Sequence, residues 1–211
     1  MQFPNAYKGV SRIYLAEILA LIGALVVMLG SVMAVGGAAA AAGGSADVGG
    51  GLVIGGAVVA LGGVVLPVIG YILQLMGLSQ ASKDEPHNFK IAFIGAIVAL
   101  LASVLSGLFV STAWLYNLCN VIAGIANLVV FVYTIGGIMQ LARELNRPNM
   151  VSLGNKILWM VLIAYIISFV VRILPIPELA VVLTVASGIL AIITYIIFLM
   201  YLSKAKKMLV V

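Results

Sequence analysis

Long apolar segments separated by short polar breaks make up nearly the whole chain. Each segment holds about 20 apolar residues or slightly more, the length that a helix needs to cross the hydrocarbon core of a bilayer. The pattern predicts six transmembrane helices, over residues 13–35, 52–78, 89–108, 115–141, 157–174 and 179–202. We therefore expect an all-α integral membrane protein, with one transmembrane domain over residues 1–211.

The short breaks pair these helices into three consecutive hairpins, over residues 1–83, 84–147 and 148–211. Tyr71, Tyr133 and Tyr195 are spaced 62 residues apart and fall at the same point in the second helix of each hairpin. The spacing favours an internal repeat, although eight tyrosines in the chain leave coincidence as the alternative. Such two-helix repeats would be parallel, related by an axis along the membrane normal.

Glycine and alanine dominate the first predicted hairpin. Residues 36–51, between its helices, form a Gly/Ala-rich stretch whose composition predicts a flexible outer loop. In the second helix glycines recur every seven residues, at Gly49, Gly56, Gly63, Gly70 and Gly77. A row of this kind leaves one helix face nearly free of side chains, so that a neighbouring helix can approach closely. We expect the first helix to pack antiparallel on this face.

The first and third predicted helices carry small-residue seams of their own. In the first helix the seam runs from Ala16 through Gly23 and Gly30 to Gly37. In the third helix it consists of Ala92, Gly95, Ala99, Ala102 and Ser106. Both seams predict close helix packing, because association in lipid depends on van der Waals contact.

Basic residues predict the orientation of the helices. Of the 11 Lys and Arg residues, only Arg172 falls on the opposite side from the other ten. Short loops rich in Lys and Arg stay in the cytoplasm, so both termini are predicted to be cytoplasmic, in the plasma membrane. The alternative is a signal peptide in place of the first helix, but the apolar run 13–35 exceeds the roughly 7 to 15 residues of a signal-peptide core.

Composition excludes several classes of protein. Apolar residues make up 64% of the 211 positions and charged residues 8%, against roughly 25% charged residues in a soluble domain. The net charge of +5 is explained by membrane topology, so no nucleic-acid partner is expected. The single cysteine, Cys119, excludes an internal disulfide framework and a cysteine-rich metal site. Since no HExxH motif, intramembrane aspartate pair or Walker loop occurs, we predict no enzyme, no metal and no cofactor.

A polar stripe in the fourth predicted helix is the best candidate for a functional surface. Asn120, Asn127 and Thr134 are spaced by seven residues and share one helix face. Because an amide is costly against lipid, the stripe should face protein or a water-filled cavity. It is interpreted either as a polar pathway or solute site, or as interhelical hydrogen-bonding groups.

Two charged residues lie near the edges of predicted helices. Glu17 follows Arg12 by about 7 Å along a helix, and is a candidate ion or proton site. The alternative is an interfacial carboxylate paired with Arg12 or another base. Arg172 ends the fifth helix and is a candidate anion site, the alternative being an interfacial side chain paired with Glu178.

The break between the second and third helices contains Asp84, Glu85 and His87. A metal site would need ligands that converge at better spacing, so a solvated charged turn is the preferred interpretation.

Two classes of function remain after these exclusions. The first is a small non-enzymatic transport or permeation component, with the stripe of the fourth helix along its polar route. The second is a membrane scaffold or accessory subunit whose small-residue faces bind other transmembrane helices. In either case the expected partners are the lipid bilayer and further membrane subunits, which are copies of this chain or other proteins.

Overall fold

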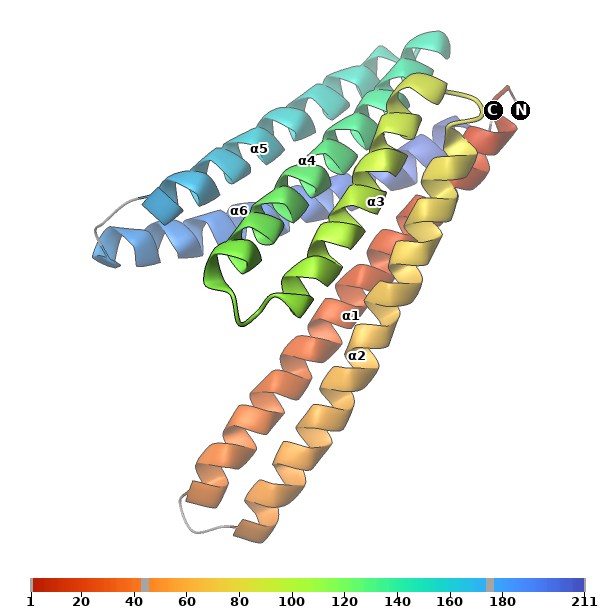
Figure 1. The fold of residues 1–211 in the computed structure, drawn as a ribbon. Helices are drawn as coiled ribbons and strands as arrows, with labels where there is room; N and C mark the ends of the chain where they lie inside the picture. Colours follow the sequence, from red (N-terminus) through yellow and green to blue (C-terminus); the bar gives the residue numbers. More distant parts are fainter. Residues whose placement is uncertain (1, 43–45, 174–176, 211) are drawn as a thin grey trace. The chain divides into compact units, whose positions relative to one another are not determined.

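The computed structural model describes residues 2–42, 46–173 and 177–210, and of residues 41, 46–50, 168–173 and 177–187 it describes the backbone only. Helices account for almost all of this part of the chain (Figure 1). In chain order they are α1 (Pro4–Ala42), α2 (Ala46–Ala81), α3 (Pro86–Leu108), α4 (Ala113–Glu144), α5 (Pro148–Ile173) and α6 (Pro177–Met208).

Each of the six helices contains a stretch that is long and apolar enough to cross a membrane. Their outward faces carry large apolar side chains, among them the exposed Leu29, Ile54 and Leu101. Such side chains indicate contact with lipid, because water would leave them unfavourably hydrated. By length and composition the chain is an all-helical, multi-pass membrane protein, as predicted.

The predicted outer loop over residues 36–51 is wrong in its extent. α1 continues to Ala42 and α2 begins at Ala46, so most of this stretch is helical. Residues 38–42 are five consecutive alanines, and alanine has the highest helix propensity of all residues. Alanine therefore extends α1 where the glycine content had favoured a loop.

Residues 12–76 form one compact unit, in which α1 and α2 pack on their glycine faces. A Cβ atom built on Gly56 would lie 2.6 Å from the carbonyl oxygen of Gly30, and one on Gly63 would lie 2.8 Å from the backbone nitrogen of Val27. Gly70 lies equally close to α1. Since these contacts are with backbone, no side chain fits at the three positions.

Other glycines of α2 have different surroundings. A Cβ on Gly51, Gly55 or Gly62 would meet no atom within 4 Å, so these glycines face away from α1. The surroundings of Gly49 lie outside the described residues. Gly77 belongs to the other compact unit, where its carbonyl oxygen lies against Gly9.

The second compact unit consists of residues 1–11 and 77–211. In it α3 packs along α4, and α5 packs on α4 and α6 (Figure 1). Phe89 at the start of α3 is fully buried, with its ring over Gly137 of α4. The rest of the buried face of α3 includes every residue of the predicted seam: Ala92, Gly95, Ala99, Ala102 and Ser106.

The two carboxylates in the break between α2 and α3 accept hydrogen bonds from backbone N–H groups at the starts of α1 and α3. Asp84 accepts from the backbone N–H of Ala6 in the first turn of α1, at 2.7 Å. Glu85 is only 5% exposed and accepts from the backbone N–H groups of Asn88 at 3.0 Å and Phe89 at 3.3 Å. First-turn N–H groups have no partner within their own helix. Glu85 is therefore a buried helix cap, and its prediction as part of a solvated turn is wrong.

Candidate functional site

The predicted polar stripe of α4 is divided between two environments. Thr134 is buried, at 2% exposure, whereas Asn120 and Asn127 are exposed. The amide nitrogen of Asn120 donates to the backbone oxygen of Tyr116 at 2.9 Å. The side chain of Asn127, near the middle of the 32-residue helix, makes no hydrogen bond within the described part of the chain.

The packing of α4 explains this division. In the first half of the helix the buried residues follow a single face, with Cys119, Ala123, Ala126 and Val130. From Thr134 to Ala142 the buried residues cover a wider part of the helix, although Gly136 and Gln140 are not buried. The first half of α4 therefore has one covered face and leaves the asparagines on an open one.

Gly124 lies between the two asparagines on this open face. A Cβ atom built on Gly124 would have no atom within 4 Å. We call Asn120, Gly124 and Asn127 the α4 amide face. It combines hydrogen-bonding groups with a point at which another backbone can approach closely.

Glu17 is half-buried in α1, within the unit of residues 12–76. Its carboxylate accepts a hydrogen bond from the side-chain amide of Gln74 of α2 at 3.3 Å. Gln74 was not predicted from the sequence as the partner of Glu17. A single glutamine within an apolar span does indicate a hydrogen-bond partner for a carboxylate on a neighbouring helix. The side chains of Arg172 and Glu178 lie outside the described residues, so the anion site stays a prediction.

A small cavity of about 160 Å³ lies between α4, α5 and α6, within the apolar spans. Its lining consists of Phe131, Val161, Ala164, Tyr165, Ala191, Thr194 and Tyr195. The hydroxyl of Thr194 is buried and has no hydrogen-bond partner among the described residues. An unsatisfied buried hydroxyl is costly, so a polar group of a small ligand could occupy this cavity.

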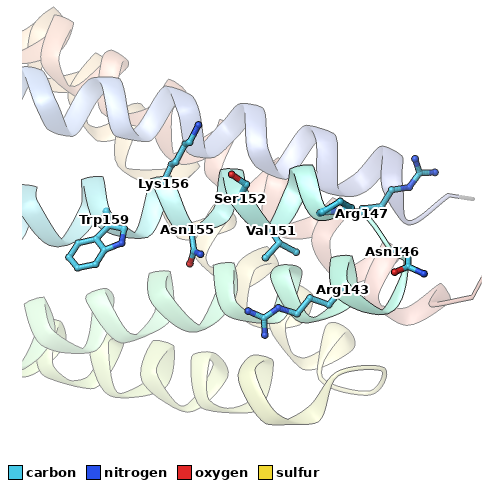
Figure 2. Close-up of a pocket in the computed structure, with 9 residues that line it drawn as sticks. Arg143, Asn146, Arg147, Val151, Ser152, Asn155, Lys156 and Trp159 are labelled. Atoms are coloured by element: carbon cyan, nitrogen blue, oxygen red, sulfur yellow. The ribbon is translucent and has the colours of Figure 1, made fainter.

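A larger cleft, of about 590 Å³, lies where α4 turns into α5 (Figure 2). We call it the basic cleft. It contains three cationic side chains: Arg143 from the last turn of α4, Arg147 from the turn, and Lys156 from α5. The rest of its lining consists of Asn146, Pro148, Val151, Ser152, Asn155 and Trp159, with Trp159 at the end far from Asn146 (Figure 2).

The turn that positions these cations depends on Asn146. Its φ of 53° is left-handed, a conformation that asparagine adopts more readily than most residues. The chain reversal lets the backbone N–H of Arg147 donate to the carbonyl of Ala142 at 2.8 Å, as in a Schellman motif. Pro148 then begins α5, where its fixed φ suits the first helical position.

A neighbouring cleft of about 470 Å³ shares Arg147 and adds Lys204 and Lys207 of α6. Five cationic side chains thus lie at one end of this unit, and within the described residues none of them makes an ion pair or a hydrogen bond. In the sequence these residues indicated only the orientation of the helices. The signal for a site was the spacing of Arg143 and Arg147 across a helix end, with polar Ser152 and Asn155 following.

Within the described part of the chain, no three His, Cys, Asp or Glu side chains are grouped as a metal site requires. Comparison with known proteins yields no relative. No protein-family model matches the sequence, and neither a curated protein nor a solved structure matches it. Family membership therefore assigns no role to the α4 amide face or to the basic cleft.

Proposed function

We propose that this chain is a non-enzymatic membrane scaffold or accessory subunit that assembles through the α4 amide face. The observation that carries the proposal is the exposed Asn127 near the middle of α4. An amide that faces hydrocarbon has no hydrogen-bond partner, which costs several kcal/mol. A second helix on this face would satisfy the amide and make close contact at Gly124.

A second copy of the chain is the partner that fits this face best. Copies that insert in the same orientation are related by an axis along the membrane normal, so identical residues meet at the same depth. The amide of Asn127 has both donors and an acceptor and can therefore pair with its own counterpart. A single buried asparagine in a helix interface is known to fix register and oligomeric state.

The Asn127→Leu substitution is expected to weaken self-association about tenfold, because one interhelical hydrogen bond in a membrane is worth about 1–2 kcal/mol. Energy transfer between labelled copies in liposomes measures the effect at several protein-to-lipid ratios. Ile125→Leu is the matched control, since Ile125 is 59% exposed and lies on the opposite side of α4 at nearly the same depth. A wild-type chain that stays monomeric in liposomes would contradict the proposed partner.

The proposal includes an orientation, with both ends of the chain and the basic cleft on the cytoplasmic side of the plasma membrane. It also includes three consecutive hairpins as the transmembrane arrangement, related as internal repeats. The support for the orientation is the position of ten of the 11 Lys and Arg residues in or beside the same set of polar breaks. The support for the repeat is the 62-residue spacing of Tyr71, Tyr133 and Tyr195.

Transport or permeation of a small solute is a second candidate function, favoured by the cavity at Thr194 and by the Glu17–Gln74 pair. Within the unit of residues 1–11 and 77–211, the α4 amide face and Thr194 would supply the polar groups of a route. Glu17, in the unit of residues 12–76, is a separate candidate for the proton or ion site. We expect Glu17→Gln to abolish proton flux into proteoliposomes, followed with an entrapped pH-sensitive dye, while the helical content stays unchanged. Equal flux in the variant and the wild type would exclude Glu17 as the proton site.

A further inference from the structure

We infer that the basic cleft at the α4–α5 turn binds the phosphate of an anionic phospholipid headgroup. The inference is independent of self-association, because the cleft lies at the C-terminal end of α4, whereas the α4 amide face lies in the first half of the helix. Its volume of about 590 Å³ falls within the range of roughly 300–1,000 Å³ that is typical of ligand sites.

Charge is the first argument for a phosphate. Arg143, Arg147 and Lys156 line one cleft from three consecutive parts of the chain. Guanidinium groups match phosphate oxygens with pairs of parallel hydrogen bonds. Ser152 and Asn155 lie between the cations along α5 and add neutral donors. Between residues 140 and 160 the sequence has one acidic residue, Glu144, which does not line the cleft.

The backbone of α5 strengthens the same preference. The helix begins at Pro148, and Val151 and Ser152 of its first turns line the cleft. The helix dipole places partial positive charge at this end of α5. Lys204 and Lys207 in the neighbouring cleft add to the positive potential. An anion in the basic cleft is therefore stabilised by the cationic side chains and by the dipole of α5.

The position of Trp159 indicates that the phosphate belongs to a lipid. Trp159 is 67% exposed and lies one helical turn beyond Lys156, and tryptophan is enriched at the level of the headgroups in membrane proteins. Beyond it α5 exposes apolar side chains to the surroundings, including Ile163 and Ile166. A lipid can place its headgroup among the cations and its acyl chains along these residues. Basic pockets between transmembrane helices bind anionic headgroups in this way.

The test uses the fluorescence of Trp159 in the full chain. Trp114→Phe removes the other of the two tryptophans, and the purified protein is titrated with micelles that contain phosphatidylglycerol, with phosphatidylcholine micelles, or with inorganic phosphate. We expect a saturable change with phosphatidylglycerol only. Arg143→Gln and Arg147→Gln should each weaken binding about fivefold and together about 25-fold, from the contribution of one basic residue at an anionic surface.

The matched control is Lys83→Gln with Lys90→Gln, which removes two exposed cations in and beside the α2–α3 break and should leave binding unchanged. Equal loss in the control pair, or an equal response to phosphatidylcholine, would overturn the site. A response to inorganic phosphate that Arg143→Gln abolishes would overturn the lipid as its source and assign a soluble phosphate. If Trp114→Phe does not fold, native mass spectrometry of phosphatidylglycerol retained by the wild type and by the same variants gives the comparison.

Discussion

Gly56→Leu is expected to separate α1 from α2, whereas Gly55→Leu leaves the helix pair intact. A Cβ on Gly56 would lie 2.6 Å from backbone atoms of Gly30 and Ala34. A Cβ on Gly55 would have no atom within 4 Å. Backbone cannot move aside without displacing α1. We expect a loss of about 3 kcal/mol in the free energy of unfolding for Gly56→Leu, at the upper end of the cost of overpacking.

Unfolding in mixed micelles with increasing dodecyl sulfate, followed by circular dichroism, measures this difference. The two variants carry the same new side chain on adjacent residues of one helix, so helix propensity and hydrophobicity cancel in the comparison. Equal stabilities for the two variants would show that the glycine face of α2 is not the surface that packs on α1.

Phe89→Ala is expected to lower the free energy of unfolding by about 3 kcal/mol, a typical cost for truncating a buried aromatic side chain. The Phe89 side chain is fully buried, and a Cβ built on Gly137 would lie 2.7 Å from its ring. In a bilayer, packing contacts between helices are a main source of stability, because burying apolar surface between helices gives no hydrophobic gain. The contacts of the Phe89 ring are therefore lost without compensation. The same dodecyl sulfate titration measures the change.

Leu101→Ala is the control in the same helix, because Leu101 is 57% exposed and contacts lipid instead of α4. Its effect should stay within about 0.5 kcal/mol, as for exposed positions in general. A loss as large as that of Phe89→Ala would mean that the outward face of α3 is covered by another helix.

The six helices were predictable because each apolar segment is long enough to span the bilayer and most polar breaks are short. The glycine rows also indicated which faces of α1 and α2 meet, because residues spaced by seven lie on nearly the same face of a helix. The stretch 36–51 was misjudged for a physical reason. Its glycines suggested a loop, but the alanines at 38–42 continue the helix.

The candidate sites were less predictable, because they depend on which helices lie beside one another. Periodicity placed Asn127 and Thr134 on one face of α4, as helix geometry requires. It could not show that neighbouring helices cover more of the second half of α4 than of the first half. Likewise the sequence indicated only a membrane orientation for Arg143, Arg147 and Lys156. In the structure, the left-handed turn at Asn146 places these three residues around one cleft.

The α4 amide face is the central element of the proposed function, and disulfide formation in the native membrane tests it most directly. Cys119→Ser removes the single cysteine, after which Asn120→Cys and, as control on the opposite side of α4, Ile122→Cys are introduced separately and oxidised, so that Asn127 stays in place. A disulfide requires Cα atoms within about 4.4–6.8 Å of each other. The account predicts a covalent dimer for Asn120→Cys and little or none for Ile122→Cys. Absence of the dimer, or equal dimer in both variants, would contradict assembly through this face.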